Sequence, residues 1–259
     1  MGDSTVTEDD GIITVTFDRQ AKRNAINPEM TEAMWAAVNA LADRDDLRVL
    51  VITGVGEYFT AGIDMKAGVG DRPGNPETEH LHAGWNFRRN YRSHHLLYDE
   101  MEAVEKPVVL AAQGTCLGAG VEMAVSCDFR FCTPRAEFRL PEVRLAGPPG
   151  SGGTSRLTKL VGPAWGKWMA MAGMAVAAEQ AKAIGLVHEV FPEETFLEDV
   201  YAWCRSLMEI QPEALGLAKL AVDISADIAD RTVQRQVDRL GASLTLEEGR
   251  KRFGPEAGQ

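Results

Sequence analysis

The stretch QGTCLGAGVEMAVSCDFRF, residues 113–131, places a single glutamate inside a run of small and apolar residues. Glu122 directly follows Gly118-Ala119-Gly120 and has apolar neighbours on both sides. An ionised carboxylate in such surroundings is expensive to desolvate unless a partner pairs with it or a reaction uses it. The glycines predict the start of a short helix over 118–126, on which Glu122 would be buried. A structural ion-paired glutamate and a functional one fit this pattern equally well.

Two apolar runs on either side of this helix decide the fold class. Residues 106–114 (KPVVLAAQG) and 127–133 (CDFRFCT) are each typical of a buried strand. Strand–helix–strand order predicts a βαβ crossover and a mainly parallel sheet, hence an α/β fold. Further elements are expected earlier in the chain: strands over 11–18 (GIITVTFD) and 47–54 (LRVLVITG), and a helix over 27–46 that begins near Pro28.

The character of the chain changes after Gly152. Segments with helical periodicity follow at 152–162, 163–173, 177–185, 193–210, 212–227 and 231–249, and residues 186–191 (LVHEVF) interrupt them as a strand. We therefore expect an α/β core over 1–195 that carries the active site, followed by a helical region over 196–259. A helical tail without an evident core often packs on a neighbouring subunit, which predicts an oligomerisation role for 196–259.

Composition limits the classes of function. The 259 residues carry a net charge of −11, which repels polyphosphate backbones, so a nucleic-acid partner is not expected. No apolar run approaches the roughly 20 residues of a membrane span, and no secretory leader is evident, so we expect a cytoplasmic protein without a membrane partner. Four cysteines form no CxxC pair and are predicted to be small buried hydrophobes: Cys116, Cys127, Cys132 and Cys204.

Three segments could carry chemistry when they are taken together: residues 58–66 (YFTAGIDMK), 117–123 (LGAGVEM) and 140–157 (LPEVRLAGPPGSGGTSRL). Turns of Gly and Ala let backbone N–H groups point outward, and at a helix start these groups favour negative charge. Two such turns facing each other could hold one carbonyl oxygen as it gains charge. Glu122 and Glu142 would then supply paired acid/base groups. Taken alone, each glycine turn is more often a tight connection.

In this order and spacing, the segments resemble the enoyl-CoA hydratase/isomerase (crotonase) superfamily. The F-x-A-G-x-D motif matches 59–64, and the G-x-x-x-G-[GA]-G-x-E motif matches 114–122. The motif that begins P-E-x-x-L-G corresponds to 141–157, where Ala146-Gly147 displaces its glycine slightly. The resemblance covers about 11–253. It implies a spiral of ββα units with a helical C-terminal region, and an oxyanion hole formed by the N–H groups of Ile63 and Ala119. It also implies that Glu122 and Glu142 are the catalytic acids.

The resemblance further implies a substrate and a mechanism. A 2-enoyl-CoA thioester would place its carbonyl oxygen in the hole, the two glutamates would activate a water for attack at C3, and Glu142 would deliver the proton to C2. Coenzyme A enters as part of the substrate, and no cofactor or metal is required. Contacts with coenzyme A are expected from Ala21, Lys22, Arg23, Ala61, Asp64 and Met65, and the acyl pocket is expected to be lined by Trp85, Phe87 and Tyr91. A homotrimer or a hexamer (dimer of trimers) is the assembly that the resemblance implies.

The sequence leaves several alternatives open. Lys22 and Arg23 are equally compatible with two solvated cations, and the three aromatic residues of the acyl pocket with generic core packing. His80, His82, His94 and His95 lack an acid or cysteine set at ligand spacing, so no metal site is predicted.

Two departures from the family pattern bear on function. The region between Asp64 and Pro107 is longer than in short-chain hydratases, and the chain ends in GPEAGQ where family members continue with basic residues. Dienoyl-CoA isomerases carry an acid at the position of Gly150, which argues against that activity. Retention of both glutamates favours hydration. An enoyl-CoA isomerase and a non-catalytic acyl-CoA-binding protein remain the alternatives.

Overall fold

The structure is a computed structural model that describes residues 2–67, 92–145, 147–227, 232–233 and 235–236. The chain divides into two compact units, Met1–Cys204 and Arg205–Gln259. The first unit contains both β-sheets, and the second contains helix α8 (Pro212–Asp227). The domain boundary that we expected near residue 195, and the oligomerisation role of the tail, stay predictions.

A six-stranded sheet forms the centre of the first unit, with strand order β1-β2-β3-β5-β7-β10. Its strands are β1 (Ser4–Asp9), β2 (Ile12–Phe17), β3 (Val49–Gly54), β5 (Val108–Ala112), β7 (Phe129–Cys132) and β10 (Glu189–Val190). Only β1 is antiparallel to its neighbour. Every residue of β3 and β5 is buried, as their continuous apolar sequences predicted. The predicted mainly parallel sheet is therefore confirmed.

A second, four-stranded sheet has the order β4-β6-β8-β9. Its strands are β4 (Tyr58–Thr60), β6 (Thr115–Leu117), β8 (Glu137–Arg139) and β9 (Val176–Ala177). Three pairs of strands follow one another along the chain: β3 and β4, β5 and β6, and β7 and β8. In each pair the first strand belongs to the large sheet and the second to the small sheet, and helices follow each pair. This repetition is the spiral of ββα units that we expected. The very short strands of the second sheet had not been predicted.

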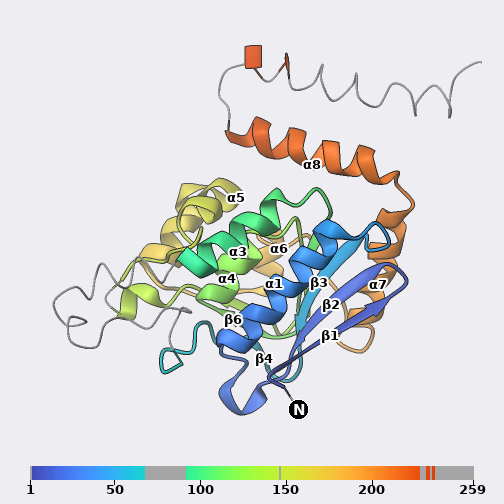
Figure 1. Cartoon of the computed structure of the whole chain (residues 1–259). Coiled ribbons are helices and arrows are strands. Elements are labelled where there is room, and N and C mark those ends of the chain that lie inside the picture. Colours follow the sequence, from blue (N-terminus) through green and yellow to red (C-terminus); the bar gives the residue numbers. More distant parts are fainter. Residues whose placement is uncertain (1, 68–91, 146, 228–231, 234, 237–259) are drawn as a thin grey trace, which may run out of the picture. The chain divides into compact units, whose positions relative to one another are not determined.

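Helices cover the sheets of the first unit, as Figure 1 shows. The α-helices are α1 (Pro28–Asp43), α3 (Arg92–Ala103), α4 (Ala119–Ala124), α5 (Ser155–Gly166), α6 (Ala178–Ala183) and α7 (Phe196–Met208), which crosses into the second unit. Shorter helical turns are η1 (Gln20–Lys22), η2 (Glu142–Leu145) and η3 (Lys167–Met171). Helix α1 begins where predicted, because the Asn27 side chain accepts a hydrogen bond from Met30 N and Pro28 needs no such partner.

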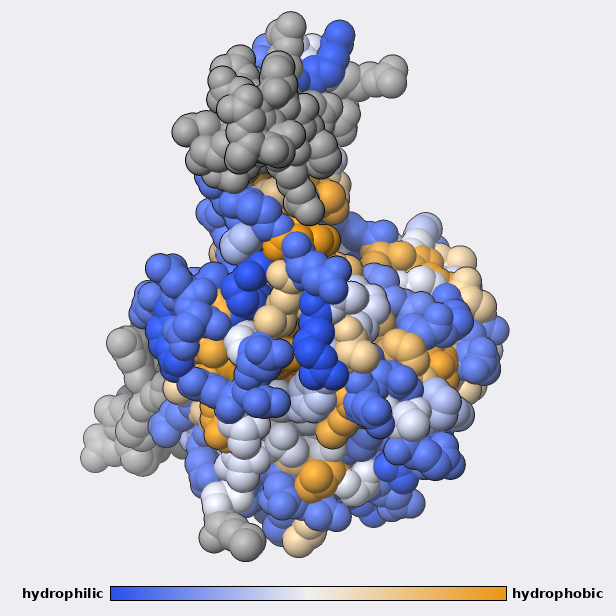
Figure 2. All heavy atoms as spheres, turned by 90° about the vertical axis from the view of Figure 1, so that its right-hand side faces the viewer, coloured by the Kyte–Doolittle hydropathy of each residue, from blue (hydrophilic) through white to orange (hydrophobic). Residues whose placement is uncertain are grey.

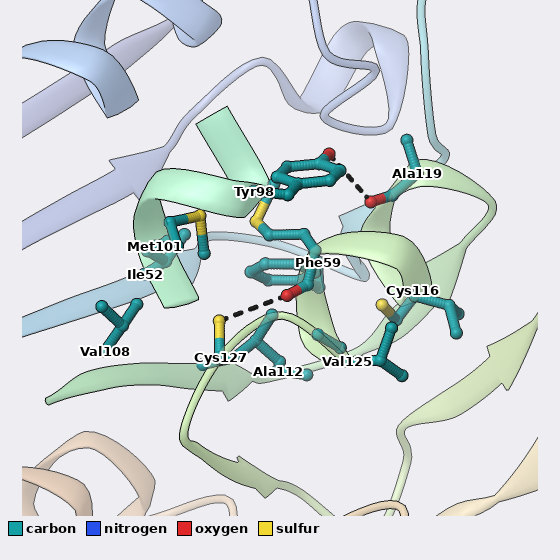
Figure 3. Packing of buried hydrophobic residues seen from close by; sticks show 14 of the residues in the cluster. Ile52, Phe59, Tyr98, Met101, Val108, Ala112, Cys116, Ala119, Val125 and Cys127 are labelled. Atoms are coloured by element: carbon teal, nitrogen blue, oxygen red, sulfur yellow. Dashed lines mark hydrogen bonds between the residues drawn. The ribbon is translucent and has the colours of Figure 1, made fainter. Parts of the chain in front are cut away.

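A large part of the core of the first unit is formed by residues of the large sheet and of helices α1, α3 and α4. Figure 3 shows Ile52 of β3 and Phe59 of β4 in one cluster with Tyr98 and Met101 of α3. All four cysteines are buried free thiols. On the face drawn in Figure 2, hydrophilic residues form most of the surface and apolar residues gather in separate patches. No helix in the described part of the chain is long and apolar enough to cross a membrane.

Candidate active site

The first corner of the site follows strand β4 and contains Gly62 and Ile63. Ile26 N donates to Gly62 O (2.8 Å), and Asp64 N donates to Ile26 O (2.8 Å). Because N–H and C=O point in opposite directions across a planar peptide, the Ile63 N–H is directed away from Ile26. No acceptor for it is found among the described residues. Gly62 has a φ of +89°, a conformation that suits glycine and turns the chain sharply here.

The second corner lies between strand β6 and helix α4. Gly118 has a φ of +54°, and its carbonyl oxygen accepts from Val121 N (2.8 Å) and Glu122 N (3.1 Å). Ala119 is the first residue of α4, so its N–H has no partner within the helix. Tyr98 of α3 donates its hydroxyl to Ala119 O (3.1 Å), which fixes this end of α4 in the core (Figure 3).

The two corners lie next to each other. A Cβ added at Gly62 would lie 3.5 Å from Ala119 N and 3.1 Å from Leu117 O, and one added at Gly118 would lie 3.9 Å from Gly62 Cα. The amides of Ile63 and Ala119, for which no acceptor is found among the described residues, therefore belong to adjoining segments. The chain separates them by more than fifty residues. Convergent backbone donors are what stabilisation of a developing oxyanion requires.

Glu122 lies on helix α4 and is only 5% exposed. Its Oε1 accepts a hydrogen bond from Gly150 N at 2.7 Å. Burial, and after it the charge of Glu142, together raise the pKa of Glu122 to about 7, against the opposing effect of the Gly150 hydrogen bond. A carboxyl group with this pKa can both take up and release a proton near neutral pH.

Glu142 begins the helical turn η2, directly after the segment that leaves strand β8. Its Oε1 lies 2.7 Å from the place where a Cβ on Gly118 would be, so the carboxyl group touches the second corner. Its Oε2 is buried without a hydrogen-bond partner in the described structure. Burial raises the pKa of Glu142 as well. A buried, unpaired carboxyl oxygen of this kind calls for a functional explanation or an additional partner such as water.

The turn over 149–153 closes over Glu122, and sequence reasoning missed this role. Gly150 supplies the amide that binds Glu122, and a Cβ on Gly153 would lie 3.0 Å from Glu122 Cγ. Ser151 has a φ of +30°, and its buried hydroxyl lacks a hydrogen-bond partner in the described structure. The sequence signal was the run of glycines, which we had considered only as a match to known motifs. The backbone amide of Gly150 thus fixes the position of the Glu122 carboxyl group.

The residues expected to contact coenzyme A lie in two adjoining segments. Ala61 N donates to Arg23 O (2.9 Å), which joins the corner after β4 to the turn that contains Ala21 and Lys22. The side chains of Lys22 and Arg23 are exposed, and the Arg23 guanidinium lies 5.3 Å from the centre of the Tyr58 ring. Met65 is also exposed, at 77%. The structure thus brings these residues together, and their role in binding stays a prediction.

Other predicted positions fall outside the described residues or serve the core. Trp85, Phe87, Tyr91, His80 and His82 lie outside the described residues. His94 is buried, with its Nε2 3.3 Å from Thr31 Oγ1. In the part of the chain that the structure describes, no group of three or more His, Cys, Asp or Glu side chains is arranged to hold a metal ion.

Fold and site together define a class of enzyme. Glu122, which is buried, and Glu142, which is partly buried, both have raised pKa values and lie near the amides of Ile63 and Ala119. No acceptor for either amide is found among the described residues, and the whole site lies within a spiral of ββα units. Such an arrangement can stabilise negative charge on a carbonyl oxygen and move protons at the carbons next to it.

Comparisons with known proteins place the chain in a family. The profile of the enoyl-CoA hydratase/isomerase family matches residues 7–255, so the chain belongs to this family. It is 32% identical to 2,3-dehydroadipyl-CoA hydratase of Escherichia coli (strain K12), over 96% of this chain and 93% of that protein. It is 34% identical to a carnitinyl-CoA dehydratase of Salmonella typhi, over 83% and 77% of the two chains.

Solved structures agree with this assignment. An enoyl-CoA hydratase from Bacillus anthracis superimposes with a TM-score of 0.86 at 26% identity, covering 97% of this chain and 96% of that one. A Geobacillus kaustophilus protein described as an enoyl-CoA hydratase subunit gives a TM-score of 0.84 at 30% identity, covering 97% and 95%. The fold class and the family expected from the sequence are therefore confirmed, and hydratase-like chemistry on a CoA thioester is supported.

Proposed function

We propose that this protein adds water across the 2,3 double bond of a 2-enoyl-CoA thioester, or removes it in the reverse direction. The observation that carries the proposal is the meeting of the two glycine corners beside Glu122 and Glu142. Ala119 N and the Glu142 carboxyl lie so close to Gly62 and Gly118 that a Cβ on either glycine would meet them, at 3.5 Å and 2.7 Å. Pure binding of a ligand would gain nothing from the buried carboxyl group of Glu122 and the buried Oε2 of Glu142, because both are costly to desolvate.

The mechanism follows from the groups at these corners. The thioester oxygen accepts hydrogen bonds from the N–H groups of Ile63 and Ala119, each worth about 3 kcal/mol as negative charge develops on that oxygen. Glu122 and Glu142 orient a water, whose oxygen bonds to C3 while its proton passes to the carboxylate pair. Glu142 delivers a proton to C2, so that H and OH are both added and the acids regain their initial protonation. These steps use only side chains and backbone amides of this chain.

The comparisons support the reaction type and leave the acyl group open. Related proteins are named for 2,3-dehydroadipyl-CoA, crotonyl-CoA and carnitinyl-CoA, whose acyl groups differ in charge and length. The residues expected to line the acyl pocket here, Trp85, Phe87 and Tyr91, fall outside the described residues, so the proposal names the thioester class and no single substrate.

Loss of the conjugated absorbance of a 2-enoyl-CoA tests the proposal. Crotonyl-CoA and longer homologues should lose this absorbance when mixed with the protein. Glu122→Gln and Glu142→Gln should each lower kcat by roughly 10²- to 10⁴-fold, because each removes a proton-transfer group. Glu105→Gln is the matched control, since it makes the same chemical change at an exposed position and should leave kcat unchanged.

The same assay separates the two alternatives. An isomerase would generate conjugated absorbance from a 3-enoyl-CoA and would need one base only, so one of the two glutamine variants would stay active. A non-catalytic member would bind acyl-CoA without any change in absorbance. Full activity of either glutamine variant in hydration would contradict the two-acid mechanism.

A homotrimer or a dimer of trimers is the assembly that we propose for the active protein. Exposed apolar side chains on and beside η2 and η3, which contact each other, offer a surface for self-association: Leu145, Trp168, Met171 and Met174. Light scattering should give the mass of three or six chains, and Met171→Glu should lower it. An unchanged mass would show that this surface does not form the interface between subunits. The cytoplasmic location stays a prediction.

A further inference from the structure

An ion pair between Arg19 and Asp64 joins the loop before α1 to the first corner of the site. Arg19 Nη1 lies 2.7 Å from Asp64 Oδ2, and the two side chains are only 17% and 15% exposed. From the sequence, Asp64 was the last residue of the F-x-A-G-x-D motif and an expected coenzyme A contact. A short, largely shielded pair of this kind is more strongly held than an ordinary surface ion pair.

Both side chains make further contacts within the protein. Asp64 Oδ1 accepts from Lys66 N (3.0 Å) and Ala67 N (3.2 Å). The Arg19 hydrogen bond is the main cause that lowers the pKa of Asp64 to about 2, so this carboxylate is ionised at neutral pH. Arg19 Nε also pairs with Asp3 Oδ2 at 3.0 Å. Through these contacts, Arg19 and Asp64 fix the position of the backbone around them.

The segment that they hold is the one that carries the Ile63 amide. Ile26 N and O bind the residues on either side of Ile63, at Gly62 O and Asp64 N. Arg19 Nη1 donates to Ala25 O (3.0 Å) as well as to Asp64. One guanidinium nitrogen therefore binds both the segment that contains Ile26 and the segment that contains Ile63. A rotation of the 62–64 backbone would therefore break several of these contacts together.

We propose that Arg19 and Asp64 are positioning residues, which hold the Ile63 N–H in the direction of the substrate carbonyl without touching substrate. The inference rests on the proposed function, because it assumes that this amide binds the thioester oxygen. Misplacement of a catalytic group by about 1 Å can lower the rate by roughly 10²-fold. We therefore expect Arg19→Gln and Asp64→Asn to lower kcat by roughly 10- to 100-fold, with KM nearly unchanged.

A chromophoric thioester reports the amide directly. In a cinnamoyl-CoA with a para-dimethylamino group, hydrogen bonds to the carbonyl draw electron density toward the oxygen and move the absorbance to longer wavelength. The wild type should bind this probe with a red shift. Arg19→Gln and Asp64→Asn should bind it with nearly the same Kd and a smaller shift. The double variant should be no worse than either single one, because both changes remove the same pair.

Arg44→Gln is the matched control. Arg44 also pairs with two carboxylates, Glu8 and Asp46, but at side-chain exposures of 42 to 68%. Its substitution makes the same change in charge and should leave both kcat and the red shift at wild-type values.

Three results would overturn the inference. A full red shift and full kcat in folded Arg19→Gln and Asp64→Asn would show that the pair does not position the amide. A large rise in Kd with an unchanged shift would make these residues coenzyme contacts. A wild type that binds the probe without any shift would contradict the oxyanion hole of the proposed function, and the inference with it.

Discussion

The two sheets of the first unit differ in what their sequences are made of and in what they carry. In the large sheet, β3 and β5 are apolar and buried along their whole length. The strands β4, β6 and β8 of the small sheet have three residues each, and each precedes a group of the candidate site: Ile63 after β4, Ala119 after β6 and Glu142 after β8. Of the two sheets, the large one therefore provides more of the buried apolar side chains, and the residues that follow the strands of the small one belong to the candidate site.

If this division holds, a cavity in the large sheet should reduce stability and spare activity. Leu110 of β5 is fully buried. Leu110→Ala should lower the free energy of unfolding by about 2–5 kcal/mol, because it removes buried methyl groups and leaves a cavity. Denaturant unfolding would measure this loss, and kcat of the folded protein should stay close to wild type. A large fall in kcat with little loss of stability would break the comparison.

The raised pKa of Glu122 should make the protein less stable as the pH rises. The pKa of Glu122 is raised from an ordinary value of 4.5 to about 7, which corresponds to about 3 kcal/mol. Between these values the native protein holds a proton that the unfolded chain has released. The stabilising effect is therefore complete below about pH 4.5 and is lost as the pH rises through 7.

Unfolding experiments at pH 5 and pH 8 would measure this effect. The stability of the wild type should fall relative to that of Glu122→Gln over this interval, because glutamine does not titrate. Parallel pH profiles for the two proteins would show that Glu122 does not have a raised pKa.

A change at a corner of the small sheet should affect activity more than stability. Gly118→Ala places a side chain at a φ of +54°, at a cost of roughly 1–2 kcal/mol. The new Cβ would lie 2.7 Å from Glu142 Oε1 and push that carboxyl group away. We expect kcat to fall well beyond the fraction of protein that unfolds, as steady-state kinetics and thermal unfolding would show.

Gly147→Ala is the control for this change. It adds the same methyl group where no atom lies within 4 Å of the new Cβ, so it should preserve both kcat and stability. Equal activity of the two alanine variants would contradict the contact between Gly118 and Glu142.

The elements of the large sheet could be predicted because hydrophobic burial leaves a clear pattern in sequence. Continuous apolar runs mark β3 and β5, and Asn27-Pro28 marks the start of α1. Strand β1 was missed because its residues, STVTED, are mostly exposed and polar. Strands of three residues were missed because two or three side chains cannot establish a period.

The site could be predicted only in part, for a related physical reason. Glu122, Glu142 and the two corners belong to local motifs, so the resemblance could predict that they lie together, and their roles stay predictions. The Gly150 amide that binds Glu122 and the pair of Arg19 with Asp64 join residues far apart in the chain. Partners of this kind follow from the packing of distant segments, which the sequence pattern does not encode locally.

A crystal structure of Glu142→Gln with bound crotonyl-CoA would test the central claim most directly. Slow turnover in this variant should preserve the substrate during the experiment. The account predicts the thioester oxygen at about 2.7–3.1 Å from both Ile63 N and Ala119 N, with the Glu122 carboxyl facing C3. A thioester oxygen bound elsewhere, or in contact with only one of these amides, would contradict it.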